Sequence, residues 1–312
     1  MDDGFDVVVV GGGAAGLNAA LVLARARRRV AVVDAGDPRN APAAHMHGFL
    51  SRDGTPPAQL LEAGRAEVAG YGGELVADRV ARIDEGFAVH LAGGRTLNAR
   101  RVLVATGLRD ELPDVPGLRE RWARDVLHCP FCHGYEVRDQ PIGVLSGLNP
   151  EVAVHLGLLL PQWSADVVFF PHTNALSEDE RERLAARGVQ VVDGEVAGLA
   201  VEGDNLRGVE LADGRVVPRA ALFVGPRFVP RDELLAGLGC ATGDHGFVSI
   251  DPTGRTSVPG VWAAGNVVDP RAQVITAAGM GSVAAIALNA DLLQEDVERA
   301  VVAHRRVATG VG

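Results

Sequence analysis

The first 34 residues pass from an apolar run through a glycine-rich turn to further apolar runs, a pattern that predicts strand, turn, helix and strand. Residues 6–10 end in four consecutive valines, which is typical of a strand buried on both faces. The turn Gly11-Gly12-Gly13-Ala14-Ala15-Gly16 follows, then an apolar helical segment over 17–27 and a second strand over 30–34. Strands that alternate with helices predict a parallel sheet.

A similar arrangement recurs in the middle of the chain. We expect a strand over 142–145, a helix over 150–160 and a strand over 165–170. A hairpin with a following apolar strand also occurs twice, over 87–112 and over 208–225. This repetition predicts an α/β protein with two dinucleotide-binding domains, each Rossmann-like with three ββα layers.

The length of the chain, 312 residues, also favours two domains, because a single core rarely grows so large. We expect residues 1–112 and 243–312 to form one discontinuous domain and residues 113–242 to be inserted into it. Ser177 with Glu180 predicts a capped helix in the inserted domain. A long helix of small residues is expected over 273–293, with fraying of the C-terminal arginines and glycines.

Charge and composition exclude several classes of partner. The chain has no lysine and a net charge of −10, so its surface repels phosphate backbones and no nucleic acid partner is expected. Polar residues interrupt the apolar stretch over 141–160, so we expect no membrane span. The acidic start runs directly into the first strand, without a basic segment or cleavage site, which predicts a cytoplasmic protein.

The glycine turn after the first strand has the spacing of a dinucleotide-binding fingerprint. Gly11 permits the tight turn, Gly13 lets the backbone approach a pyrophosphate, and Gly16 allows close packing of helix on strand. Asp34 ends the next strand, where a carboxylate accepts hydrogen bonds from a ribose. The position of Asp34 does not separate FAD from NAD.

The segment Cys129-Pro130-Phe131-Cys132-His133 admits three chemistries. A structural zinc site needs a second close pair of ligands, which the sequence lacks. A Cys-x-x-Cys-His segment is also the attachment signature of c-type haem, which belongs to exported chains. A redox-active dithiol in a flavoprotein is the interpretation we favour. The third cysteine, Cys240, lies in an apolar context that predicts a core residue.

The chain resembles the low-molecular-weight thioredoxin reductase family over nearly its full length. The resemblance is carried by the first glycine turn, the triplet 105–107, the cysteine pair, and the segment 256–266 with Gln273-Val274. It implies bound FAD and a homodimer. It also implies that Cys129 exchanges with the substrate and that Cys132 faces the flavin.

His133 stands where that family normally has an aspartate that acts as acid and base. An imidazole with the ordinary pKa near 6.5 is about half protonated at cytosolic pH, so we expect His133 to take a proton from an incoming thiol. As an imidazolium it would also favour the cysteine thiolate.

The resemblance further implies a set of FAD contacts, and Asn266 stands in it where aspartate is usual. The amide adds no charge beside the diphosphate. The helix that begins at Gln273 and Val274 would direct its N-terminus at the pyrimidine end of the flavin. The expected FAD contacts are Gly11, Gly13, Ala14, Ala15, Gly16, Asp34, Ala35, Asn40, His47, Val80, Ala105, Thr106, Gly107, Gly265, Asn266, Gln273 and Val274.

The inserted domain departs from the family where NADPH should bind. After the strand over 142–145, Gly147 is the one glycine available for close approach to a pyrophosphate, and it is followed by Leu148 and Glu151. The segment 171–173 is Pro-His-Thr, where the reductases carry arginines for the 2′-phosphate. These departures indicate a domain that no longer binds a pyridine nucleotide.

Without NADPH, electrons must enter through the cysteine pair. The chain is similar in this respect to the dithiol oxidases that close disulfides in gliotoxin- and holomycin-type natural products, as is its segment 45–50 with His45 and His47. The resemblance implies oxidation of a small-molecule dithiol by the pair, with electrons passing via FAD to O2 and H2O2 as product. The alternatives are an NADPH-dependent thioredoxin reductase and a flavoprotein redox sensor.

Overall fold

The computed structural model describes residues 4–308, and these fall into two compact units. The first unit contains Met1–Arg39, Ala58–Leu108 and Pro230–Gly312, and the second contains Asn40–Pro57 and Arg109–Val229. These divisions differ from the expected boundaries at 112 and 243. The segment after Pro230 belongs to the first unit because Leu235 and Cys240 are buried in its core.

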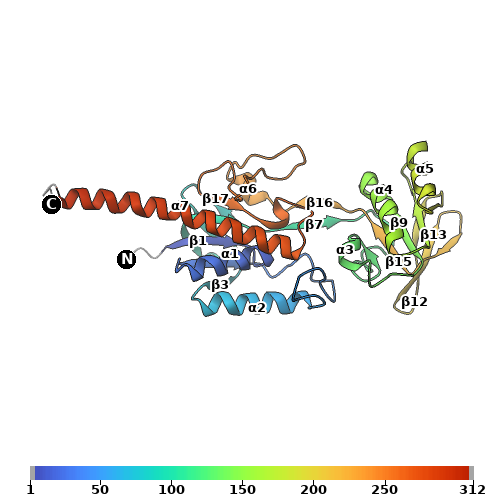
Figure 1. Cartoon of the computed structure of the whole chain (residues 1–312), viewed down its shortest axis with the longest axis horizontal. Coiled ribbons are helices and arrows are strands. Elements are labelled where there is room, and N and C mark those ends of the chain that lie inside the picture. The colour runs from blue at the N-terminus through green and yellow to red at the C-terminus, as the bar shows by residue number, and fades with distance from the viewer. Residues whose placement is uncertain (1–3, 309–312) are drawn as a thin grey trace. The chain divides into compact units, whose positions relative to one another are not determined.

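The first unit is built on a sheet whose central strands are parallel (Figure 1). The order β3-β2-β1-β6 is followed by the hairpin β5-β4, which pairs antiparallel with the first part of β6, while β17 pairs in parallel with its last part. The strands are β1 (Phe5–Val10), β2 (Val30–Asp34), β3 (Glu74–Ala77), β4 (Val80–Ile83), β5 (Ala88–Leu91), β6 (Thr96–Val104) and β17 (Val261–Ala263).

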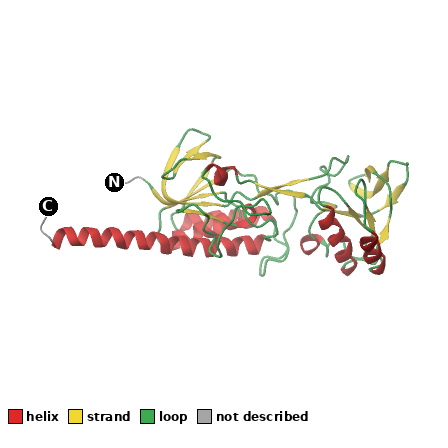
Figure 2. Ribbon diagram, turned by 90° about the horizontal axis from the view of Figure 1, so that it is seen from above, coloured by secondary structure: helices red, strands yellow, loops and turns green. Residues whose placement is uncertain are grey.

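The four valines of β1 are buried on both faces, as the pattern predicts. Val7 and Val9 pack with α1 and α7, whereas Val8 and Val10 pack on the opposite side with the hairpin strands. The long helices α1 and α7 accordingly lie along one face of the sheet in Figure 2, whereas the short helix α6 packs on the other face. The helices are α1 (Ala14–Arg25), α2 (Pro57–Gly70), α6 (Glu233–Gly237), η2 (Gly265–Val267) and α7 (Val274–Ala308).

The second unit repeats the plan in a smaller form. Its five-stranded sheet has the order β11-β10-β9-β15-β8, with parallel neighbours, and an antiparallel sheet β12-β13-β14 accompanies it. The strands are β8 (Val126–Leu127), β9 (Ile142–Leu145), β10 (Val167–Phe170), β11 (Gln190–Val191), β12 (Val196–Glu202), β13 (Asn205–Leu211), β14 (Val216–Pro218) and β15 (Ala221–Val224). A separate two-stranded sheet pairs β7 (Leu108–Glu111) with β16 (Arg227–Pro230).

Two helices of the second unit begin where the sequence predicts, α4 (Pro150–Leu159) and α5 (Glu178–Ala186). The short helices α3 (Pro130–His133) and η1 (Leu160–Gln162) were not predicted as separate elements. The capping box is confirmed, because the Ser177 hydroxyl accepts from the Glu180 amide and the Glu180 carboxylate accepts from the Ser177 amide at 2.8 Å. The first helix of the chain, expected over 17–27, instead begins at Ala14, inside the glycine turn.

The C-terminal helix α7 is much longer than expected. The helix continues past the expected end at residue 293 to Ala308, and it passes beyond its own sheet in Figure 1. The expected fraying was wrong for Arg305 and Arg306, which are helical, while Gly310 and Gly312 lie outside the described residues. Residues 274–307 are long and apolar enough to cross a membrane by length and composition, a test that the core helix of a folded domain also passes. The expectation of no membrane span did not consider this helix. Its first half is a core helix, in which Ala284, Leu288 and Leu292 are buried.

Close packing of α7 on α1 depends on Gly281. A Cβ at this position would lie 2.1 Å from the backbone oxygen of Ala15. Gly281→Ala should therefore push the helices apart and lower the free energy of unfolding by about 1–3 kcal/mol, measured by denaturant titration. Gly279, two residues earlier, has open space around it, so Gly279→Ala should instead stabilise the protein by about 0.5–1 kcal/mol. Equal effects of the two substitutions would contradict this account of the packing.

Candidate active site

The glycine turn before α1 leaves an open space for a ligand. Gly13 directly precedes the helix, and no side chain accepts a hydrogen bond from the first amides. A Cβ at Gly13 would meet no atom within 4 Å, whereas one at Gly16 would lie 1.9 Å from the oxygen of Gly11. Gly16 is thus required by the close packing of the chain on itself. At Gly13 the absence of a side chain leaves open space in which a ligand can approach the backbone. Amides at a helix N-terminus are a site for a pyrophosphate.

Asp34 lies beside this turn, as expected for a residue that binds a ribose. A Cβ on Gly12 would come within 2.7 Å of the Asp34 carboxylate, which accepts from the Arg65 guanidinium at 3.3 Å. Gly265 lies against the start of α1 on the other side, since a Cβ there would be 3.0 Å from that of Ala15. The two sequence motifs predicted to bind FAD therefore meet at one helix N-terminus.

The remaining predicted FAD contacts are distributed over both units. The turn after β6 is tied down, because the Thr106 hydroxyl donates to the oxygen of Arg231 at 2.6 Å. Val80 is buried in the core of the first unit. Asn40 and His47 belong to the second unit. The other predicted contacts lie in the first unit, namely Gly11, Gly13, Ala14, Ala15, Gly16, Asp34, Ala35, Ala105, Thr106, Gly107, Gly265, Asn266, Gln273 and Val274.

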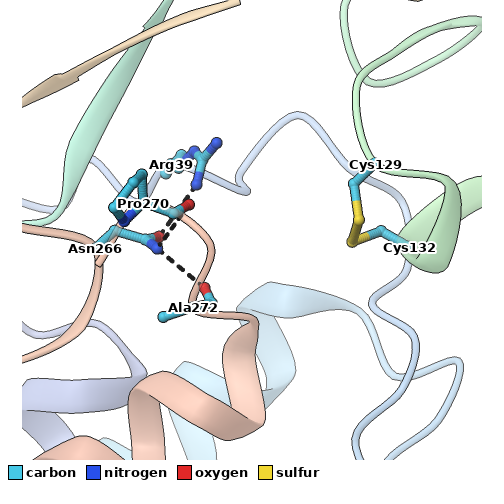
Figure 3. Close-up of a disulfide and its surroundings, with 6 residues drawn as sticks. All are labelled: Arg39, Cys129, Cys132, Asn266, Pro270 and Ala272. Carbon is cyan, nitrogen blue, oxygen red and sulfur yellow. Dashed lines mark hydrogen bonds between the residues drawn. A yellow bond between two sulfur atoms is a disulfide. The ribbon is translucent and has the colours of Figure 1, made fainter. Parts of the chain in front are cut away.

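The two cysteines of the predicted redox pair form a disulfide (Figure 3). Cys129 directly precedes the short helix α3, and its oxygen accepts from the amides of Cys132 and His133, each at 3.1 Å. Both cysteines are half-buried. In residues 4–308, no group of three or more metal-ligating side chains is placed to hold a metal ion. This geometry suits exchange with an external thiol.

Cys240 has the opposite environment. It is buried in the core of the first unit, where burial raises the pKa of its thiol. Its thiol donates to the Thr256 hydroxyl. The expectation of a core cysteine is confirmed.

His133 is largely buried beside the disulfide, and this changes its expected protonation. Burial lowers the pKa of its imidazole, His47 lowers it further, and the negative charge of Glu136 acts against both. Its Nδ1 is buried and has no hydrogen-bond partner among the described residues. His133 is therefore chiefly neutral near pH 7, not half protonated. A neutral imidazole is ready to accept a proton from a thiol but does not stabilise a thiolate by its charge.

His47 connects the segment 40–57 to the turn that follows the redox pair. Its Nδ1 lies 3.4 Å from the Asp53 carboxylate, and its Nε2 lies 3.4 Å from that of Glu136. The Gly48 amide and His47 together lower the pKa of Asp53. Glu136 was not predicted from the sequence. The one feature of the sequence that could have indicated it is its position three residues after His133. His45 is exposed, and the structure assigns it no contact of this kind.

The corresponding turn of the second unit is filled by the chain's own groups. The Asn149 side chain accepts from the Val152 amide at 3.3 Å and so caps α4. Pro150 occupies the first helical position and has no amide hydrogen to offer, while Glu151 places a negative charge in the first turn. A Cβ on Gly147 would lie 3.0 Å from the Pro113 ring, so this glycine faces a neighbour and not an open cradle.

The loop after β10 closes over the same turn. Asn174 donates to the oxygens of Ser146 and Gly147, at 3.3 and 3.0 Å. The His172 ring is engaged as well, because its Nδ1 accepts from the Val196 amide at 2.9 Å. The segment 171–174 thus supplies structural hydrogen bonds where a 2′-phosphate would require cations.

Comparison with known proteins agrees with this architecture. The model of the pyridine nucleotide-disulphide oxidoreductase family matches residues 5–154 and 164–286. The chain belongs to this family. It is 33% identical to thioredoxin reductase sirT of Leptosphaeria maculans, over 94% of this chain and 96% of that protein, and 32% identical to thioredoxin reductase aclD of Aspergillus oryzae, over 92% and 96%.

Two solved structures are also similar to the oxidoreductase. The crystal structure of HlmI is 60% identical, with a TM-score of 0.96 over 99% of this chain and 98% of that chain. Putative thioredoxin reductase TrxB from Bacillus anthracis is 34% identical, with a TM-score of 0.89 over 94% and 99%. Thioredoxin reductase-like members of the family are FAD-binding flavoproteins, and the open cradle at Gly13 fits that cofactor.

The role of Gly13 can be tested by adding one methyl group. Gly13 has a φ of −79° and open space, so Gly13→Ala should fold with the stability of the natural protein. Its Cβ would occupy the cradle, so FAD affinity should fall at least about tenfold, a loss of ~1.4 kcal/mol, measured by flavin fluorescence. Unchanged FAD affinity in the folded variant would show that the pyrophosphate does not bind at this turn.

The environment of His133 predicts the pH dependence of thiol oxidation. A base acts in its neutral form, so kcat/KM should rise with pH through an inflection below the ordinary value of 6.5. Glu136→Gln should move the inflection to lower pH, and His47→Gln should move it to higher pH, because these groups act on the imidazole in opposite directions. A shift of both variants in one direction, or an unchanged profile in His133→Ala, would refute the assignment of His133 as the base.

Proposed function

We propose that this oxidoreductase is an FAD-dependent dithiol oxidase, which closes an intramolecular disulfide in a small-molecule dithiol and uses O2 as the electron acceptor. The observation that carries the proposal is the N-terminus of α4. Asn149 and Pro150 occupy the positions at which a pyridine nucleotide would place its pyrophosphate, and Asn174 covers the preceding turn. If no pyridine nucleotide binds there, the substrate must deliver its electrons to the cysteine pair.

The reaction begins with disulfide exchange at Cys129. His133 removes a proton from one substrate thiol, and the thiolate attacks the sulfur of Cys129. The bond between the two cysteines breaks, and Cys132 leaves as a thiolate with the electron pair. A mixed disulfide between the substrate and Cys129 results.

The second substrate thiol completes the ring. His133 gives the first proton to the solvent and then takes the proton of this second thiol. The resulting thiolate attacks the substrate sulfur of the mixed disulfide, which releases the cyclic disulfide and the thiolate of Cys129. The substrate has then lost two electrons and two protons, and the cysteine pair has gained the electrons. Bound FAD would take these electrons from the pair and deliver them to O2, giving H2O2. The neutral imidazole of His133 is ready to accept a proton at the start of each cycle.

An NADPH-dependent thioredoxin-disulfide reductase is the second candidate, and the names of the relatives favour it. Both sirT and aclD are called thioredoxin reductases. In such an enzyme, electrons run from the nucleotide to the disulfide, in the direction opposite to the proposed reaction. The two candidates therefore differ in whether NADPH or a dithiol reduces the flavin.

Anaerobic mixing experiments separate these functions. NADPH should leave the visible flavin band unchanged, whereas a small dithiol such as dithiothreitol should bleach it. Admission of O2 should then give one H2O2 for each disulfide formed. Rapid bleaching by NADPH would establish the reductase, and bleaching by dithiol without turnover would favour a redox sensor.

The cysteine pair should be required for turnover but not for flavin binding. Cys129→Ser and Cys132→Ser should each lower the rate of dithiol-dependent H2O2 formation at least about 1000-fold, because neither variant can form the disulfide. This corresponds to an increase of ~4 kcal/mol in the activation free energy. Cys240→Ser serves as the matched control and should retain turnover, since Cys240 lies in the core. FAD content should be equal in the two pair variants and the natural protein. Full activity in Cys132→Ser would exclude the pair as the electron entrance.

A further inference from the structure

The side chain of Asn266 is engaged by the turn that leads into α7. Its Nδ2 donates to the oxygens of Asp269 and Ala272, each at 2.9 Å, with a longer contact of 3.5 Å to Pro270. Figure 3 shows the Pro270 and Ala272 oxygens converging on this one nitrogen. Only a side chain with hydrogen-bond donors can hold these carbonyl groups together.

The other end of the amide is held by Arg39. The guanidinium donates to the Asn266 Oδ1 at 3.2 Å (Figure 3). A flipped amide would place its oxygen against the three carbonyl oxygens and its NH2 group against the guanidinium. The two sets of contacts therefore define one orientation of the amide, which joins the loop after β2 to the turn before α7.

The turn also has hydrogen bonds of its own, among them one from the Arg271 amide to the Asp269 carboxylate at 2.9 Å. The Asp269 amide donates to the oxygen of Gly265 at 3.0 Å, and the Ala272 amide donates to the oxygen of Asp269 at 3.2 Å. Gln273 follows, and its oxygen accepts the first hydrogen bond of α7, from Ala277 at 2.8 Å. A displacement of the turn would therefore shift the N-terminus of α7.

We infer that Asn266 is a positioning residue for the bound flavin, which acts by fixing the turn 269–272 and with it the first residues of α7. The sequence comparison treated Asn266 as a loss of charge relative to aspartate. The contacts give the amide a different role, because a carboxylate would place an oxygen within repulsive distance of the same carbonyl groups. The inference concerns how FAD is held and is independent of the proposed electron acceptor.

Two substitutions distinguish an effect of Asn266 on the position of the turn from an effect of charge at this residue. Asn266→Asp keeps the shape but removes the donor and adds a charge, whereas Asn266→Leu removes the donor without a charge. If the donor matters, both variants should weaken FAD binding at least tenfold and both should lower the reduction potential of the bound flavin. A change in Asn266→Asp alone would show an effect of charge and overturn the inference, as would no change in either variant.

The chain offers a matched control at Asn289 in α7. There the side-chain oxygen accepts from the Arg28 guanidinium at 2.7 Å, so aspartate can replace asparagine without losing this contact. Asn289→Asp should leave both FAD affinity and the flavin potential unchanged. A drop equal to that of Asn266→Asp would show that any added carboxylate in this unit has the effect, and would overturn the inference.

A second measurement applies even if the Asn266 variants do not fold. In flavin-free protein, Arg39→Ala should accelerate amide hydrogen exchange at residues 268–273, because the amide loses the group that orients it. Unchanged exchange in this segment would overturn the inference. Neither measurement involves dithiol turnover, so failure here and failure of the oxidase proposal are recognised separately.

Discussion

Gly13 gives the first turn of α1 no side-chain cap, and the binding of a dinucleotide by the first unit depends on this feature. The amides of a first helical turn have no partners within the helix, so they must be satisfied by side chains, solvent or a ligand. At Gly13 the chain leaves them to a ligand, but at α4 it supplies Asn149 as a cap and Pro150 in place of an amide. Two copies of one sheet plan thus differ in the groups that the first helical turn offers to a ligand.

The base beside the cysteine pair is held uncharged, although carboxylates lie near it. His133 is kept neutral by burial, and the carboxylate of Glu136 opposes this effect only in part. His47 lies between Glu136 and Asp53, so it neutralises carboxylate charge near the pair when it is protonated. A neutral imidazole next to a half-buried disulfide avoids the cost of a buried ion in the resting state. It becomes charged only when it takes the proton of a thiol and pairs with the thiolate that forms.

The regular elements could be predicted from the sequence because their signals are local. Four valines define β1, and the Ser177–Glu180 pair defines the start of α5. The association of segment 40–57 with the second unit could not be predicted, since it depends on contacts such as that of His47 with Glu136, whose residues are distant in sequence. The continuation of α7 beyond residue 293 was missed for another reason: alanine, arginine and glutamate favour helix without needing a buried face.

The same distinction separates the fold of the second unit from its capacity to bind a nucleotide. The sheet of the second unit is specified by buried strands such as Ile142–Leu145, whereas its capacity for a nucleotide depends on the loops at the strand ends. Asn149 satisfies an amide that a phosphate would need and Pro150 removes one, whereas Asn174 donates to the carbonyl groups of the preceding turn. None of the three belongs to the core. A nucleotide site can therefore be lost without loss of stability, because its hydrogen bonds are replaced by others within the chain. Restoring it would require several simultaneous changes, since a free amide at α4 is of little use while Glu151 remains in the first turn and no cation follows β10.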